Sequence, residues 1–180
     1  MAESKKYTPA MRSIGFRPHA SYRREQRTSE RMDPEASVTH ERYLHQVQFA
    51  LFGCQMVEEA LKSLLMCARD INRIAPAEYA RISESNDELD ELPLGRLILL
   101  FHRVLPDSNM LPDLQRLRPE RNHCAHRALT FCFLSDISGA ISLDKEFARI
   151  SAARQLAWSC FEALKPVLAA AEKRIAELLK

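Results

Sequence analysis

Glycine, CxxC pairs and long apolar runs are scarce or missing in this 180-residue chain. Only four glycines occur, and together with many alanine, leucine, glutamate and arginine residues this predicts an all-α protein. No apolar run approaches the length of a membrane-spanning helix, so we expect a soluble protein without membrane contact. The five cysteines form no CxxC pair and are odd in number. With no signal peptide, they indicate a reduced, cytoplasmic location.

A strong net charge is also missing. The chain carries 26 basic and 24 acidic side chains, a net charge of +2, so any binding to nucleic acid must depend on a local patch. Residues 1–36 hold eight Lys/Arg against five Asp/Glu, or +3, which leaves −1 for the rest. Their apolar residues follow no period and three prolines interrupt them, which predicts a disordered basic tail. The tail either keeps the protein soluble or touches RNA or a partner through residues 22–27.

Helical periodicity organises residues 37–180 into one expected domain. Apolar residues recur at helical spacing over 38–74, 93–105, 110–133 and 143–179, which predicts a four- or five-helix up-and-down bundle. Pro119 is expected to start a new helix within the third segment, and Pro166 to kink the last. The acidic stretch 77–92 is expected to hold a short helix over 77–83 and a loop at 85–87. It is either a solvated face or a docking surface for a partner protein.

The segment 116–129 is the densest run of potentially reactive side chains, with four arginines, two histidines, one asparagine and one thiol. Arginine is well suited to bidentate phosphate recognition. A helix that starts at Pro119 would place Arg121 and Asn122 in its first turn, where free N–H groups favour an anion. Asn122 and His126 share a helix face. Arg121 lies about 140° round the axis from His126, so a second copy of the segment would be needed to close the site.

The pattern Arg121-Asn122, three residues, then His126 resembles the signature of the HEPN superfamily. Many HEPN proteins are metal-independent ribonucleases of toxin–antitoxin, abortive-infection or CRISPR-associated systems. Two further stretches support the resemblance: residues 55–65 look like the long HEPN helix with a Glu followed by Leu-Lys, and residues 94–101 look like its Gly-led helix. The resemblance spans roughly residues 38 to 178 in the family's order.

The resemblance implies metal-independent RNA cleavage without a cofactor, at a composite site of a homodimer. Arg121 would hold the scissile phosphate, His126 would carry a proton, and Asn122 would bind phosphate or fix the His126 tautomer. Glu58 and His123 are expected to support them. Further contacts to RNA are expected from Arg116, Arg118 and Arg127. An antitoxin or other regulatory protein is a possible partner. HEPN toxins controlled by a nucleotidyltransferase carry a modified Tyr two residues past the His, and Ala128 cannot be modified in that way.

Other interpretations remain open for these residues. Glu58 could form an exposed pair with Lys62 instead of turning inward toward the motif. His123, Cys124 and His126 invite a zinc interpretation, although structural zinc normally needs four ligands. Cys124 could act as a nucleophile. The chain could also be a non-catalytic HEPN-like module that binds nucleotide, RNA or protein, in which Arg121 pairs with Glu58 and His126 caps backbone carbonyls. It could also be a helical subunit of a larger assembly.

Overall fold

A computed structural model describes residues 40–76, 78–128, 130–131 and 143–180. They form α2 (His40–Ile74), α3 (Asn86–Glu91), α4 (Leu94–Val104), α5 (Leu111–His123), the π-helical turn η1 (Cys124–Ala128) and α7 (Leu143–Leu178). The described residues contain no strand, so the all-α helical bundle is confirmed. The expected tail over 1–36, its boundary at 37 and the turn at 135–142 lie outside the described residues. None of the described helices has an apolar stretch suited to crossing a bilayer.

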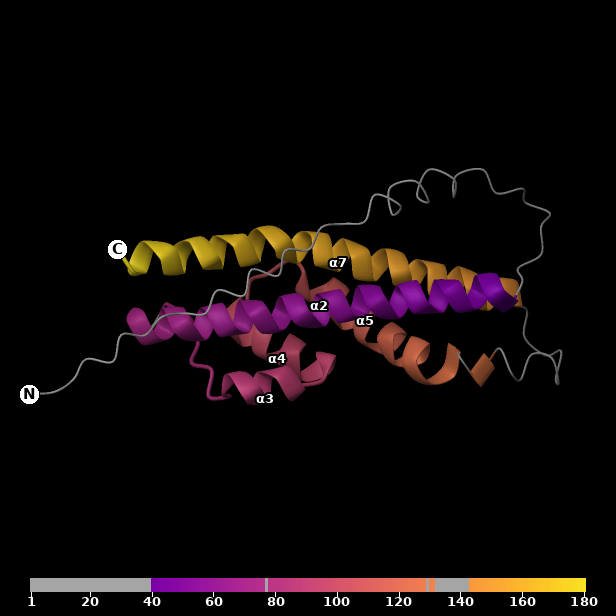
Figure 1. Ribbon diagram of the computed structural model, residues 1–180, viewed down its shortest axis with the longest axis horizontal. Coiled ribbons are helices and arrows are strands. Elements are labelled where there is room, and N and C mark those ends of the chain that lie inside the picture. The colour runs from indigo at the N-terminus through magenta and orange to yellow at the C-terminus, as the bar shows by residue number, and fades with distance from the viewer. Residues whose placement is uncertain (1–39, 77, 129, 132–142) are drawn as a thin grey trace, which may run out of the picture. The chain divides into compact units, whose positions relative to one another are not determined.

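The two long helices α2 and α7 pack against each other side by side and run in the same direction (Figure 1). The contacts follow the same order along both helices. Arg154 Nη1 donates to Gln46 Oε1, and further along both helices Gly53 lies opposite Ala157. A Cβ atom built on Gly53 would lie 3.1 Å from the Ala157 Cβ. The missing side chain at Gly53 therefore lets the two helices approach closely. Helix α7 continues through Pro166 as one helix.

Helices α4 and α5 form an antiparallel pair, in which α4 packs on α2 and α5 packs on both α7 and α2. Gly95 near the start of α4 lies against Arg118 near the end of α5. Helix α5 runs opposite to α2, because Arg121 contacts Glu58 while the later residue Ala128 contacts the earlier residue Tyr43. In the predicted up-and-down bundle, the first and last of four helices would be antiparallel. Helices α2 and α7 are parallel, so the order of helix directions differs from that prediction. The long connection between α2 and α4 accounts for this difference, because it returns the chain to the middle of α2 before α4 begins.

That connection differs from the prediction. Residues 79–84 are not helical, whereas residues 86–91 form α3. The helix predicted over 77–83 is therefore wrong over its described residues, and the loop predicted at 85–87 is right only for Ser85, because Asn86 and Asp87 are helical. The reason is a capping box: the Glu88 N–H donates to Ser85 Oγ, and the Ser85 N–H donates to Glu88 Oε2, which satisfies two free donors at the start of a helix. The Asn72 side chain holds the preceding loop through the Tyr79 backbone.

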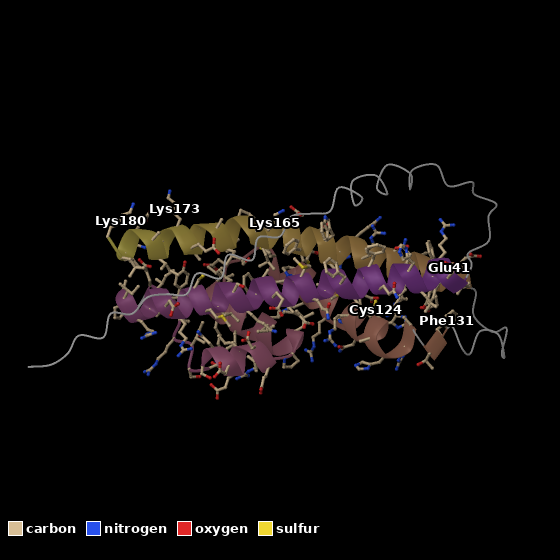
Figure 2. All side chains as sticks on the ribbon, in the orientation of Figure 1. Glu41, Cys124, Phe131, Lys165, Lys173 and Lys180 are labelled. Atoms are coloured by element: carbon tan, nitrogen blue, oxygen red, sulfur yellow. The ribbon has the colours of Figure 1, made fainter. Side chains whose placement is uncertain are left out.

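The buried side chains form two clusters along the bundle. The larger cluster joins α2, α4, α5 and α7 around Leu61, Phe101 and Leu164. The smaller cluster joins the start of α2 to η1 and α7 around Tyr43, Cys124 and Ile150. Figure 2 shows Cys124 in the interior beside α2, and Phe131 toward the end of the bundle where Glu41 lies. The segment with the Arg–His motif therefore spans both clusters, and packing fixes its position.

Candidate functional site

The motif lies at the end of α5 rather than at the start of a helix. Helix α5 continues from Leu111 through Pro119 to His123, so the new helix predicted at Pro119 is wrong. Proline removes one N–H from a helix interior and crowds the carbonyl group of residue i−4, and here the packing of Leu114 and Leu117 in the core keeps the helix continuous. Arg121 and Asn122 thus lie in the last turn of α5. The free N–H groups of a first helical turn are therefore not available to them, and the anion site predicted at a helix start is wrong.

A π-helical turn follows directly and changes the angle between Arg121 and His126. Residues Cys124–Ala128 bond in the i→i+5 pattern. Each residue in such a turn advances by a smaller angle round the helix axis than in an α-helix. The angle between Arg121 and His126 is therefore smaller than the roughly 140° expected for a continuous α-helix. Tyr43, which is fully buried, donates its hydroxyl proton to the Ala128 carbonyl oxygen over 3.1 Å. This hydrogen bond from α2 fixes the end of the π turn.

Arg121 is held by Glu58, which turns inward from the middle of α2. Arg121 Nε donates to Glu58 Oε1 over 2.9 Å, and the exposed fractions of the two side chains are 31% and 13%. Lys62 pairs with Glu59, not with Glu58, so the exposed Glu58–Lys62 pair is wrong. Only Nε is used in this contact. The Nη groups of Arg121 have no hydrogen-bond partner among the described residues, and they remain available to a ligand.

A pocket of about 180 Å³ opens beside Arg121. One wall is the start of α4, from Pro93 to Arg96, and the other is the face of α5 that carries Arg118, Arg121 and Asn122. Residues three and four apart share a helix face, which explains why these three α5 side chains converge. Arg96 is paired with Glu84 at 3.3 Å. The pocket therefore gathers three guanidinium groups and one amide from two helices.

Gly95 explains how Arg118 enters this pocket. A Cβ atom at position 95 would lie 2.8 Å from Arg118 Nε and 3.1 Å from its Cζ; the first distance is closer than a Cβ atom approaches a non-bonded neighbour, so the guanidinium group would have to move. The absence of a side chain thus lets the guanidinium group lie against the first turn of α4. No salt bridge or hydrogen bond joins Arg118 to any other residue that the structure describes, so its charge is not neutralised within the described part of the protein.

The remaining side chains of the motif point to different surroundings. His126 and Arg127 are exposed, and within the described ranges neither side chain has a hydrogen-bond partner. His123 is turned inward, with Nε2 lying 2.9 Å from Glu146 Oε2 on α7. Arg116 is exposed and pairs with Asp113 at 3.1 Å. The pocket therefore unites Arg118, Arg121 and Asn122, whereas His126 lies outside its lining.

The thiol of Cys124 is packed in the core and unsuited to nucleophilic attack. Its exposed fraction is 0%, and burial raises its pKa to about 11. Burial likewise raises the pKa of Cys54 to about 12 and that of Cys160 to about 11. Because the thiolate is the reactive form, these thiols act as apolar core atoms at neutral pH, and the nucleophile interpretation of Cys124 is wrong.

Three residues of the site escaped the sequence analysis. Arg96 lines the pocket, Tyr43 fixes the π turn, and Glu146 binds His123. The position of Arg96 directly after Gly95, at the start of a helix, was a usable signal. Tyr43 and Glu146 lie 85 and 23 residues from their partners in the sequence, and no local pattern marks them.

The described residues offer no group of three or more His, Cys, Asp or Glu side chains placed to bind a metal ion. His123 is engaged with Glu146, Cys124 is buried and His126 is exposed, so these three side chains do not converge. No family model matches the sequence, and comparison with curated proteins and with solved structures gives no match either.

Proposed function

We propose that this protein is a metal-independent endoribonuclease of the HEPN type, a toxin or defence effector, with Arg121 and His126 as its catalytic pair. Arg121 binds the scissile phosphate and offsets the charge that builds up in the transition state. His126 accepts the proton of the ribose 2′-OH or donates one to the leaving 5′-oxygen. Asn122 adds a hydrogen bond to the phosphate. The products carry a 2′,3′-cyclic phosphate and a 5′-OH.

The arrangement of Arg121 is the observation that supports this proposal. Glu58 fixes the guanidinium group through Nε, while the rest of the group faces a pocket with two further arginines and Asn122. A guanidinium oriented by a carboxylate is already placed for phosphate, which reduces the cost of positioning it in the transition state. The exposed His126 lies within the π turn that follows α5. In a purely structural role, Arg121 would pair with Glu58, as it does, and His126 would also be occupied by an internal partner, which its side chain lacks among the described residues.

The active site is proposed to be shared between two copies of the chain. His126 does not line the pocket of its own protomer, and a two-fold axis through the 116–129 segment would bring the His126 of a second copy to Arg121. The proposal can be tested by mixing Arg121→Gln protein with His126→Ala protein. If subunits exchange freely, half of the dimers regain one of two sites, so activity should return to about a quarter of wild type for a two-fold dimer. No recovery in verified mixed dimers would rule out the shared site.

A non-catalytic RNA- or nucleotide-binding module is the second candidate function. One observation favours it. The convergent side chains of the pocket are Arg96, Arg118, Arg121 and Asn122. They can donate hydrogen bonds to an anion, but none of them acts as a general acid or base near neutral pH. In this case the pocket would bind a phosphate group without cleaving a bond. The two functions differ in whether the protein cleaves RNA and whether that cleavage requires His126.

The experiment that separates them is RNA cleavage in excess EDTA by four purified proteins: wild type, His126→Ala, Arg121→Lys and His102→Ala. His102 is an exposed histidine on α4 and serves as the matched control. We expect His126→Ala to lose roughly 10²–10⁴-fold in rate, the range for general acid–base catalysis. Arg121→Lys should also be impaired, because an ammonium group cannot replace the bidentate fork. His102→Ala should cleave at the wild-type rate.

Circular dichroism should show that all four proteins are folded. Cleavage by His126→Ala at the wild-type rate, or complete loss of cleavage in EDTA, would contradict the proposed mechanism. If no protein cleaves RNA although all are folded and dimeric, the binding module is the better description.

A further inference from the structure

We infer that the pocket between the start of α4 and the end of α5 is a binding site for a phosphate group of an RNA strand, separate from the scissile phosphate. We call it the α4 pocket and define it by Gly95, Arg96 and Arg118; Arg121 and Asn122, to which the scissile phosphate is assigned, also line it. The identification of the ligand as RNA rests on the proposed function. The preference for an anion rests on the residues of the pocket alone.

Charge is the first argument for an anion. Three guanidinium groups line the α4 pocket, and the two neighbouring carboxylates leave their charge incompletely balanced. Glu58 contacts only Nε of Arg121, and Glu84 contacts Arg96 through a single atom pair. Arg118 has no acidic partner among the described residues. Arginine presents a planar fork of donors that matches the oxygens of phosphate, so Arg118 is the residue best placed to bind one.

The start of α4 adds to this attraction. The first turn of the helix follows Pro93, which provides no side-chain cap, and the N–H groups of Leu94 and Gly95 have no hydrogen-bond partner in the described part of the chain. Free N–H groups at a helix start favour a negative ligand. Gly95 exposes this backbone and at the same time admits Arg118. Side chains of α5 and backbone of α4 thus face the same small volume.

The size of the α4 pocket selects the kind of phosphate ligand. Its volume of about 180 Å³ is below the roughly 300–1,000 Å³ of pockets that enclose drug-sized molecules. It can hold a phosphate group but not a whole nucleotide with its base and ribose. The base and sugar would remain outside, so the pocket recognises the backbone and carries no base specificity. An internal phosphodiester and a terminal phosphate monoester both have this chemistry.

The test measures binding without cleavage. The probe is a fluorescent uridine 12-mer with 2′-O-methyl groups, which lack the 2′-OH nucleophile, prepared with either a 5′-hydroxyl or a 5′-phosphate. Fluorescence anisotropy gives Kd for wild type, Arg118→Gln, Gly95→Ala and Arg103→Gln. Arg103 is an exposed arginine at the opposite end of α4, about 13 Å along the axis from Leu94 by helix rise. Its substitution removes the same charge outside the pocket.

We expect Arg118→Gln to raise Kd about tenfold, the effect of losing one charge-assisted contact. The slope of log K against log salt should fall by about 0.7, the value for one phosphate contact on a single strand. Gly95→Ala should weaken binding several-fold although no charge is lost, because the new Cβ atom displaces the Arg118 guanidinium. This variant should remain at least as stable as wild type, since alanine favours helix more than glycine does. Arg103→Gln should change Kd less than twofold.

The pocket assignment is overturned if Arg118→Gln and Gly95→Ala bind like wild type, or if Arg103→Gln weakens binding as much as Arg118→Gln. Tighter binding of the 5′-phosphorylated probe, lost in Arg118→Gln, identifies a terminal phosphate as the ligand. Equal binding of both probes, weakened in Arg118→Gln, identifies an internal phosphodiester. The proposed cleavage is tested separately: if wild type binds this probe but cleaves no RNA, the pocket stands and the nuclease fails. If wild type cleaves RNA and the pocket variants bind the probe like wild type, the nuclease stands and the pocket assignment fails.

Discussion

The pairing of Glu58 with Arg121 can be tested by removing the charge of Glu58 without changing its shape. The contact is a charge-assisted hydrogen bond of 2.9 Å between α2 and α5, and such bonds contribute about 1.5–3 kcal/mol. The exposed fractions of 13% and 31% allow partial screening by water, and glutamine keeps a neutral acceptor at this position. We therefore expect Glu58→Gln to lower the free energy of unfolding by about 1–2 kcal/mol. For a protein of this size that lowers Tm by about 2–8 °C.

Glu59→Gln is the matched control on the same helix. Glu59 pairs with Lys62 at the same distance of 2.9 Å, but its side chain is 65% exposed, so the change should cost less than about 0.5 kcal/mol. Urea unfolding of Glu58→Gln, Arg121→Gln and the double variant completes the cycle. The double variant should be more stable than the sum of the single losses indicates, by about 1 kcal/mol. The pairing is refuted if the two single losses add, or if Glu58→Gln is no more harmful than Glu59→Gln.

Three further predictions concern the packing that holds the motif. Tyr43→Phe should lower the free energy of unfolding by about 1–2 kcal/mol in urea, because it leaves the buried Ala128 carbonyl without its donor; an unchanged midpoint would count against the role of this hydrogen bond. Cys124 should resist alkylation by iodoacetamide at pH 8 in the native protein and react in 6 M guanidinium, because burial raises its pKa; equal labelling in both conditions by peptide mass spectrometry would contradict the buried position. Gly53→Val should destabilise the protein by about 1–3 kcal/mol through overpacking between α2 and α7, and a wild-type melting curve would show that the helices can separate freely.

Periodicity was sufficient to predict the main helices. The predicted range 143–179 agrees with α7 at Leu143–Leu178, and the predicted range 38–74 agrees with α2 over the part that the structure describes. Both helices bury a stripe of regularly spaced apolar residues, and such a stripe is visible in the sequence. The capping box of Ser85 and Glu88 was visible too. It marks the start of α3 at Asn86, after the range 77–83 that was predicted as helix.

The details of the site depend on tertiary contacts that local patterns do not encode. Glu58 had two possible partners, and the one it contacts lies 63 residues away, whereas Lys62 lies one turn away. Burial of the Glu58 side chain decides between them, because a carboxylate turned inward needs a cationic partner. Pro119 was expected to interrupt its helix, but the packing of α5 in the core overrides this local preference. The end of the π turn likewise contacts another helix, through the hydroxyl group of Tyr43.

The convergence of Arg118, Arg121 and Asn122 was only half visible in the sequence. Their spacing of three and four residues places them on one face of a helix, and the predicted RNA-binding set already included Arg118. The opposite wall of the pocket required the fold, because Gly95 and Arg96 belong to a different helix. The functional roles of these residues remain predictions, which the cleavage and binding assays test.

The most direct test of the central claim is the chemistry of the cleaved bond. A defined RNA oligonucleotide is incubated with wild-type protein in EDTA, the cleavage position is mapped, and the same oligonucleotide is prepared with a single 2′-deoxyribose at the nucleotide 5′ to that bond. We expect fragments with 2′,3′-cyclic phosphate and 5′-OH ends from the first substrate. We expect no cleavage at that bond in the second, although both bind equally. Cleavage of the deoxy-substituted bond, or fragments with 5′-phosphate ends, would contradict proton transfer from the 2′-OH by His126.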